Sequence, residues 1–389
     1  MNHQSILNRR YDVIVVGARP AGAGSALLLA RRGLRVLLVD RGVYGTDTLS
    51  THALMRAGVL QLARWGVLPR IIAARTPAIT AATFTYGEER LTVPVKARDG
   101  ISGLYAPRRF VLDSALVNAA AAAGVVVAFE TTVRDLIRDR HNRVCGVVAR
   151  SQSGDIVNIS AGLVVGADGM RSSIAQLVKA PVIKAGTCSS ANVYGYWSGL
   201  GQDEYRWYYG RGIAAGAIPT NDGLTCVFAS VPTQRFAETF GGDVGRGYQE
   251  LLTKVAPDLI EPRRPGRLVT KLRGFAGLPA HLRQPAGPGW ALVGDAAYFK
   301  DPLTAHGITD ALVEAEYLSA AIAENSDTAL TSYAADRDQR VAAIFRVTDS
   351  IASFQWTLDE ARSLHKALAA AMTEEVRALG AFNRETVAT

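Results

Sequence analysis

The 389-residue sequence has few cysteines, and their spacing argues against two classes of site. Cys145, Cys188 and Cys226 lie far apart and form no Cys-x-x-Cys pair. That spacing disfavours a structural zinc site or a disulfide framework. Few, widely separated cysteines are typical of proteins in a reducing compartment. The first ten residues are polar and contain no apolar core, so we expect no signal peptide. We therefore predict a cytoplasmic protein without a metal site.

The sequence also lacks a long apolar run and a dense basic block. The Ala-rich uncharged stretch Ser114–Phe129 is divided by Gly124 and is shorter than the roughly 18 apolar residues of a membrane-spanning helix. The net charge of +8 comes from scattered basic residues, which fit a solvated surface better than a site for an anionic ligand. We therefore predict no membrane span and no nucleic-acid partner. With 48% hydrophobic residues, the chain has the composition of a globular protein long enough for two domains.

A dinucleotide-binding pattern stands near the start of the chain. The apolar run Tyr11–Val16 predicts a buried parallel strand, and Ala21–Arg32 has apolar residues at helical spacing and ends before Gly33. A second buried strand, Val36–Val39, ends at Asp40. In this pattern the glycines of the turn allow close packing, the helix N-terminus faces the pyrophosphate, and the acid accepts hydrogen bonds from the ribose.

One residue of the turn Gly17–Gly22 departs from the pattern. Arg19 stands where a second glycine would let the backbone approach a phosphate. Either the backbone still reaches the phosphate with the Arg19 side chain folded outward, or the guanidinium itself meets a phosphate. A Rossmann-like unit that binds no nucleotide is the alternative to both.

Two later motifs complete a set that suits an FAD molecule. Gly166-Ala167-Asp168-Gly169 follows the strand-like run Leu163–Val165, and Gly294-Asp295 comes late in the chain. Alone, the first is more often a simple turn, and Asp295 could be a structural helix N-cap. The order and spacing of all three motifs along one chain favour FAD binding over these separate explanations.

With these residues the chain resembles the single-component aromatic hydroxylases, flavoprotein monooxygenases of the para-hydroxybenzoate hydroxylase superfamily. The resemblance runs from about Tyr11 to Ala335 and is carried by Gly17–Gly22, Arg56–Leu60, Arg109–Leu112, Asp168-Gly169 and the block from Gly294 to Gly307. It implies an α/β fold, with a Rossmann-like FAD-binding domain, an inserted antiparallel-sheet substrate domain and C-terminal helices. The corresponding segments are 1–75, 100–178 and 274–330 for the FAD-binding domain, 76–99 and 179–273 for the substrate domain, and 331–389 for the helices.

The resemblance also implies which residues hold FAD. Asp295 would bond the ribityl chain, Arg109 would lie along the ribityl–pyrophosphate stretch, and Arg56 would begin a helix beside the adenosine half. The segment of Asp168 would serve both FAD and the nicotinamide nucleotide. The loop Pro302–Ile308 would pass beneath the flavin ring and present helix N–H groups to its pyrimidine end. The implied cofactor-binding residues are Gly17, Arg19, Pro20, Ala21, Gly22, Asp40, Arg41, Arg56, Arg109, Asp168, Gly294, Asp295, Pro302, His306, Gly307 and Ile308.

The last block departs from the family pattern. Where the family has Gly-Gln-Gly-Met-Asn, this chain has Ala305-His306-Gly307-Ile308-Thr309. Thr309 can still cap or hydrogen-bond, so we expect FAD binding to survive. No acid–base pair stands out, and the catalytic residues stay unassigned. His306, His52 and the tyrosines are candidates, although a lone histidine is more often structural than catalytic.

The middle of the chain changes to strand-like alternation. Segments 191–197, 206–209, 212–219 and 224–231 alternate, with a hairpin turn at Asn221-Asp222-Gly223. Together with 82–86 and 89–95 they predict an antiparallel sheet over the flavin. Seven aromatic residues gather here, and either core packing or contact with a substrate explains them. They are Tyr194, Tyr196, Trp197, Tyr205, Trp207, Tyr208 and Tyr209.

Hydroxylation or epoxidation is the function that the resemblance implies. NADPH or NADH would reduce FAD, and O2 would form a flavin hydroperoxide that passes oxygen to an aromatic or other electron-rich hydrophobic substrate. A halogenase is disfavoured, because Ala214–Pro219 lacks both tryptophans of the halogenase Trp-x-Trp-x-Ile-Pro motif. The alternatives are a geranylgeranyl-reductase-like enzyme, whose aromatic-rich motif is also absent, and an FAD-binding protein without turnover. A separate flavin reductase and a homodimer stay open.

Overall fold

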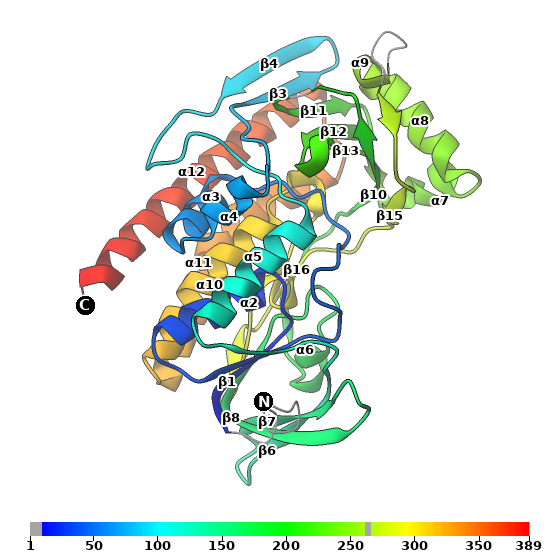
Figure 1. Ribbon diagram of the computed structural model, residues 1–389. Helices are drawn as coiled ribbons and strands as arrows, with labels where there is room; N and C mark the ends of the chain where they lie inside the picture. Colours follow the sequence, from blue (N-terminus) through cyan, green and yellow to red (C-terminus); the bar gives the residue numbers. More distant parts are fainter. Residues whose placement is uncertain (1–9, 202, 261–265, 389) are drawn as a thin grey trace.

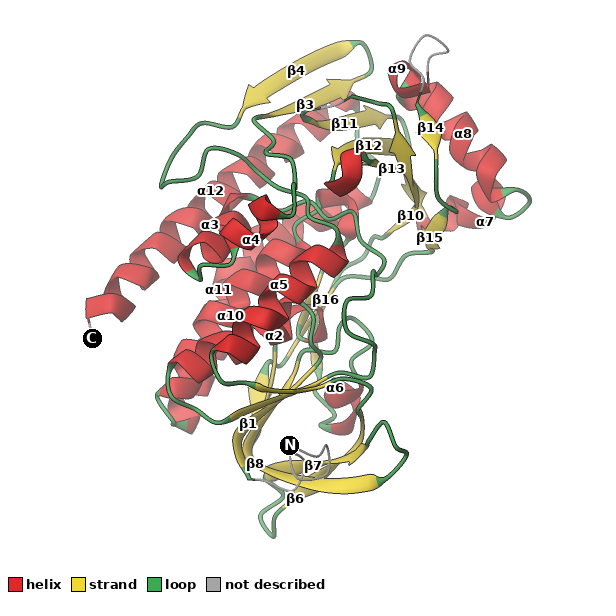
Figure 2. Cartoon of the chain, in the orientation of Figure 1, coloured by secondary structure: helices red, strands yellow, loops and turns green. Residues whose placement is uncertain are grey.

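The computed structural model describes residues 10–201, 203–260 and 266–388, and Figure 1 shows how their helices and strands are arranged. One sheet lies at each end of the molecule, and a layer of helices lies between the two sheets (Figures 1 and 2). Helix α12 (Leu358–Ala388) runs along this layer to the C-terminus.

The first sheet is Rossmann-like. Its strand order is β17-β18-β8-β1-β2-β5, and β1 (Tyr11–Val16) pairs in parallel with β2 (Val36–Val39) and β8 (Ile156–Gly166). The strands predicted at 11–16 and 36–39 are confirmed. The remaining strands are β5 (Val126–Ala128), β17 (Ala286–Gly287), β18 (Trp290–Leu292), and the hairpin of β6 (Thr132–Arg138) with β7 (Val144–Arg150), which pairs with β8.

Both faces of this sheet are covered, which is why its strands are apolar throughout. Val13 and Val15 face the helices α2 (Pro20–Arg31), α5 (Arg109–Ala122) and α10 (Gly307–Ala323). Ile14 and Val16, which alternate with them, face a second core cluster that includes residues of β6 and β7. Helix α2 packs against both α5 and α10.

The second sheet is built from two separate parts of the chain, in the order β14-β10-β13-β12-β11-β3-β4 with β15 beside β10. The predicted hairpin turn is confirmed, since Asp222 and Gly223 have φ of 63° and 65° between two antiparallel strands. One pair, β3 with β11, is parallel. The strands are β3 (Ala81–Tyr86), β4 (Glu89–Pro94), β10 (Ser190–Ser198), β11 (Tyr205–Gly210), β12 (Ile213–Pro219), β13 (Thr225–Pro232), β14 (Arg267–Leu268) and β15 (Arg273–Phe275).

Helices and a small sheet complete the fold. The predicted C-terminal helices are α11 (Asp327–Ala352) and α12, with a break at Phe354, whose φ is 55°. The other elements are α3 (Arg56–Arg64), α4 (Leu68–Ala73), α6 (Ser173–Leu177), α7 (Phe236–Phe240), α8 (Val244–Val255), α9 (Pro257–Ile260), and the sheet of β9 (Val182–Ala185), β16 (His281–Arg283) and β19 (Tyr298–Phe299).

The predicted α/β fold class is confirmed, while the domain boundaries stay predictions. Among the described residues, no helix combines the length and the apolar character needed to cross a membrane.

Candidate functional site

A cavity of about 220 Å³ opens between the two sheets, where the N-terminal ends of three helices meet. Pro20 begins α2, Arg109 begins α5 and Gly307 begins α10, and all three residues line the cavity. Free N–H groups and helix dipoles make such ends favourable for negative charge. The rest of the wall comes from Arg19, Ala21, 49–53, Ala167, Gly169, Met170, Asn192, Tyr194, Phe228, Phe275, Asp295, Phe299, Lys300, Pro302, Ala305, Ile308 and Ala311.

The turn before α2 requires glycine at both ends. Gly17 has φ of 109°, and a Cβ there would lie 2.4 Å from the carbonyl oxygen of Ala167. A Cβ on Gly22 would lie 1.8 Å from the carbonyl oxygen of Gly17. Late in the chain, Gly294 has φ of 62°, and a Cβ there would lie 2.8 Å from Cβ of Ala21 in α2. The three predicted motifs therefore lie side by side, because their glycines let β1, β8 and the Gly294 turn close around the start of α2.

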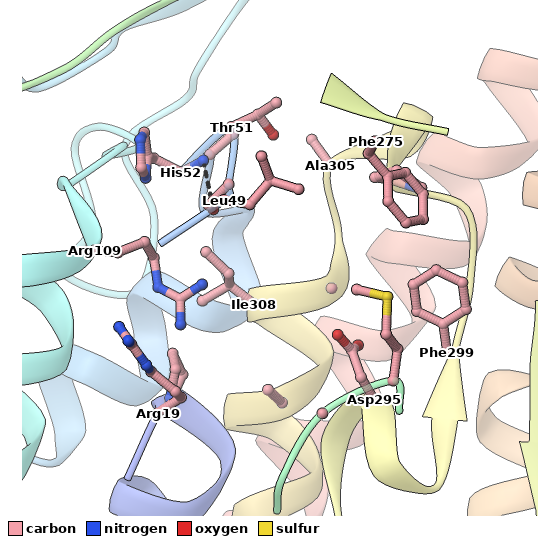
Figure 3. A pocket seen from close by; sticks show the side chains of 18 of the residues that line it. Arg19, Leu49, Thr51, His52, Arg109, Phe275, Asp295, Phe299, Ala305 and Ile308 are labelled. Atoms are coloured by element: carbon pink, nitrogen blue, oxygen red, sulfur yellow. Dashed lines mark hydrogen bonds between the residues drawn. The ribbon is translucent and has the colours of Figure 1, made fainter. Parts of the chain in front are cut away.

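Two arginines share one carboxylate beside these helix ends. Arg19 Nη1 lies 2.6 Å from Asp113 Oδ2, and Arg109 Nε lies 3.1 Å from Asp113 Oδ1. The two guanidinium groups and the one carboxylate have a net charge of +1 at the cavity wall, which would attract a bound diphosphate. Figure 3 shows both guanidinium groups on the same side of the cavity. This placement favours the second option for Arg19, in which the guanidinium itself meets a phosphate.

Asp40 lines a second, smaller cavity that shares Arg19 with the first. The backbone N–H groups of Ala18 and Gly42 each donate to one oxygen of its carboxylate, both at 2.6 Å. Arg19 lines both cavities, and Phe129 lines the smaller one. The Asp40 carboxylate is held in place by backbone groups and still has lone pairs for ribose hydroxyls. Arg19 thus belongs both to the cavity that contains Asp40 and to the cavity that contains Asp295.

Asp295 lies at the opposite side of the large cavity from Arg19 and Arg109 (Figure 3). Its carboxylate is partly exposed, and within the described part of the chain no group donates a hydrogen bond to it. Burial raises the pKa of Asp295 to about 6, against the opposing influence of Lys300 and Arg109. An acceptor without donors at a cavity wall suits a ligand that brings hydroxyl groups.

An Asp295→Asn variant is expected to be more stable than the wild type without FAD at pH 7. Because the folded-state pKa lies above the ordinary value of 3.8, the folded protein binds this proton more tightly, and the free energy of unfolding falls as pH rises from about 4 to about 6. We expect a gain of about 1 kcal/mol, below the full linkage value because the side chain is partly exposed. Urea unfolding at pH 7 and pH 4 checks this, and an equal gain at both pH values would contradict it.

Seven of the residues predicted to bind the cofactor do not line either cavity. Gly17, Gly22 and Gly294 are three of them and shape the turns around the start of α2, whereas the other four lie elsewhere. Arg41 is exposed, and the Arg56 guanidinium donates to the carbonyl oxygens of Lys96 and Arg98. The Asp168 carboxylate accepts hydrogen bonds from Ser172, Ser173 and Ile174 and caps the start of α6. The His306 side chain points away from the cavity towards α12. The roles of these four residues in binding stay predictions that this geometry does not support.

His52, the other histidine candidate, does line the large cavity. Its backbone has φ of 69°, and its Nε2 forms a hydrogen bond with the Tyr196 hydroxyl. Burial lowers the pKa of His52 to about 3; the neighbouring Arg109 and Arg108 act in the same direction, and Asp47 opposes them. The imidazole is therefore neutral at pH 7 and can accept or donate one hydrogen bond, but it does not supply a positive charge.

The wall opposite α10 was largely missed by sequence reasoning. Two cross-strand pairs on one face of the second sheet form it: Tyr194 opposite Phe228, and Asn192 opposite Phe275. Of the seven aromatic residues predicted as core or substrate contacts, Tyr194 alone lines the cavity. The others are buried in the described core clusters. Because alternate residues of a strand share a face, the position of Tyr194 could have predicted that Asn192 faces the cavity. No feature of the neighbouring sequence identified Phe228, Phe275, Phe299 or Lys300 as lining residues.

Comparisons with known proteins agree with this geometry. Residues 10–197 match the family model FAD_binding_3, described as an FAD binding domain. A digeranylgeranylglycerophospholipid reductase of Methanothrix thermoacetophila is 28% identical over 312 residues, which cover 78% of this chain and 75% of the relative. The myxobacterial chondrochloren halogenase CndH superposes with a TM-score of 0.78 at 24% identity, covering 89% of this chain and 83% of that one. Pseudomonas aeruginosa PqsL, solved with 2-aminobenzoylacetate, superposes with a TM-score of 0.77 at 19% identity. The match covers 92% of this chain and 100% of that one. These two likenesses concern the fold.

Proposed function

We propose that this FAD-dependent oxidoreductase is a monooxygenase of the superfamily that includes the aromatic hydroxylases, and that it acts on an uncharged, apolar small molecule. NADPH or NADH would be the electron donor and O2 the second substrate. The observation that carries the proposal is the uncharged, mainly aromatic wall that the second sheet presents to the cavity.

The residues at the other end of the cavity fit FAD. Arg19 and Arg109 would hold the diphosphate, Asp40 the adenosine ribose, and Asp295 the ribityl hydroxyls. The first N–H groups of α10, at Gly307 and beyond, would face the electron-rich end of the flavin ring. The chemistry that FAD supplies when bound is hydride acceptance and oxygen activation.

The charged groups of the cavity divide it into two regions. Arg19, Arg109, Asp295 and Lys300 all belong to the segments assigned to FAD. The facing wall offers Asn192, Tyr194, Phe228 and Phe275, none of which is charged. Because a buried carboxylate without a partner is costly, this wall favours a neutral substrate over an anionic one. Its side chains would exclude water and orient an apolar ring.

A second candidate function is the reduction of an apolar alkene. The similarity to archaeal digeranylgeranylglycerophospholipid reductases over more than three quarters of this chain favours it. An apolar wall would also suit an isoprenoid chain. The two functions differ in the use of O2, since only oxygenation consumes it.

The distinguishing experiment starts from the FAD-loaded protein under anaerobic conditions. We expect NADPH or NADH to bleach the flavin, and readmission of ¹⁸O2 with methyl 4-hydroxybenzoate or another neutral aromatic compound to place ¹⁸O in the product. The free acid, 4-hydroxybenzoate, serves as the charged control and should react more slowly. Saturation of geranylgeraniol without O2 would instead support the reductase. Bleaching only after a flavin reductase is added would mean that a partner delivers the electrons.

A further inference from the structure

The loop that lines the cavity before α10 is held from behind by α12. His306, the residue before α10, is buried, and its Nε2 lies 2.9 Å from Glu375 Oε2 of α12. Asp310 of α10 lies 3.6 Å from the same nitrogen. Glu375 stands 69 residues further along the chain, on a helix that contributes no residue to the cavity wall.

The neighbouring turn needs support. Ala305 lines the cavity with φ of 50°, a left-handed conformation that costs a non-glycine residue about 1 kcal/mol. At its N-terminal side the loop is fixed by Asp301, which accepts hydrogen bonds from the backbone and hydroxyl of Ser190 at 2.6 Å each. At its C-terminal side the contact between His306 and Glu375 does the same. A left-handed alanine persists where the residues around it leave no alternative.

The geometry points to Glu375 as a positioning residue for FAD. By holding His306, it keeps Ala305 left-handed and directs the first N–H groups of α10 towards the cavity. Helix α12 thus belongs to the cofactor site without touching the cofactor. This inference rests on FAD binding and not on the oxygenation reaction.

The charged groups around His306 are consistent with a direct hydrogen bond between His306 and Glu375, without a bound metal ion. Lys300 forms an ion pair with Asp310. Burial opposes the ionised form of Glu375, but His306, Lys300 and Arg340 outweigh it and lower the pKa of Glu375. His306, Asp310 and Glu375 offer ligand atoms within 4.8 Å of one another, which is close enough for a divalent cation. The amino group of Lys300 already pairs with Asp310 as the positive partner in this cluster, and it therefore opposes the binding of a metal cation there.

The test compares FAD affinities, measured by quenching of flavin fluorescence, in four variants of the contact and one control variant. We expect Glu375→Ala to weaken binding by about 10-fold, equivalent to the loss of one charge-assisted hydrogen bond, and Glu375→Gln to recover most of it. His306→Ala should match Glu375→Ala, and the double variant should be no weaker than either, because both remove one contact. Glu374→Gln is the matched control: it alters an exposed carboxylate paired with Arg377 and should bind as the wild type does.

Hydrogen exchange of the FAD-free proteins gives a second reading. Amides of 302–310 should exchange faster in Glu375→Ala than in the wild type, while those of β1 should not change. A folded Glu375→Ala protein with wild-type FAD affinity would overturn the inference, as would additive losses in the double variant. Tighter FAD binding with added Zn²⁺ or Mn²⁺, reversed by EDTA, would make the cluster a metal site instead. A wild type that binds FAD but oxygenates nothing would refute the proposed function and leave this test intact.

Discussion

An Arg109→Met variant is expected to bind FAD about 30-fold or more weakly than the wild type. The substitution removes one guanidinium from the Arg19–Asp113–Arg109 group, and Asp113 then neutralises Arg19 completely. The cavity wall loses its surplus positive charge together with a charge-assisted hydrogen bond to the diphosphate. Equilibrium titration with FAD measures the loss. The wild-type affinity should also fall with added salt, and the variant's affinity should fall less steeply.

The control for this variant is Arg206→Met. Arg206 pairs with Glu204 at 2.8 Å on the second sheet, and both side chains are about as buried as Arg109 and Asp113. Neither residue lines the cavity. The control should lose stability to a similar extent and keep its FAD affinity. Equal losses of affinity in both variants would show that the effect is general destabilisation, which would remove Arg109 from the proposed site.

A Gly22→Val variant is expected to lose FAD binding altogether and to unfold more easily by about 3 kcal/mol. A Cβ on Gly22 would overlap the carbonyl oxygen of Gly17 at 1.8 Å, and its next neighbour is the Ala167 side chain at 3.0 Å. The start of α2 would have to move away from β1, so the N–H groups of the turn would no longer converge on the diphosphate. Urea unfolding and FAD titration of the same sample measure the two effects.

Gly380→Ala is the matched control for a glycine within a helix. The nearest atom to a Cβ on Gly380 is the end of the Arg384 side chain at 3.8 Å, so the residue has room. Because alanine favours helix over glycine, this variant should gain up to about 1 kcal/mol and bind FAD normally. A Gly22→Val protein that still bound FAD with wild-type affinity would contradict the proposed role of the turn.

The parts of the fold that were predicted well are those that local sequence determines. The strands Tyr11–Val16 and Val36–Val39 are continuous apolar runs, because each is covered on both faces, and the glycine at position 17 marks the turn between strand and helix. The hairpin at Asp222-Gly223 follows from two residues that accept positive φ.

The parts of the site that could not be predicted depend on contacts between distant residues. The position of the Arg19 guanidinium is decided by Asp113, 94 residues later, and that of His306 by Glu375. Nothing near either residue in sequence indicates these partners. Asp168 is a different case, because its carboxylate caps the start of α6 only a few residues later, and the motif alone did not show that this local use takes the side chain away from the cavity.

The aromatic residues of the second sheet were ambiguous for a different reason. Alternation shows which residues share a face, but here both faces are buried. Tyr194 faces the cavity, whereas Trp197 and Tyr208 pack on the other face with residues of α8. A buried sheet therefore gives no contrast in polarity between its core side and its substrate side.

FAD binding is best tested by the visible absorbance spectrum of the purified protein, recorded after incubation with FAD and removal of the free cofactor. We expect the two-banded spectrum of bound oxidised flavin at one FAD per chain, weakened in Arg109→Met and absent in Gly22→Val. A folded wild-type protein that retains no flavin would contradict the assignment of the cavity between the two sheets, and with it the oxidoreductase function.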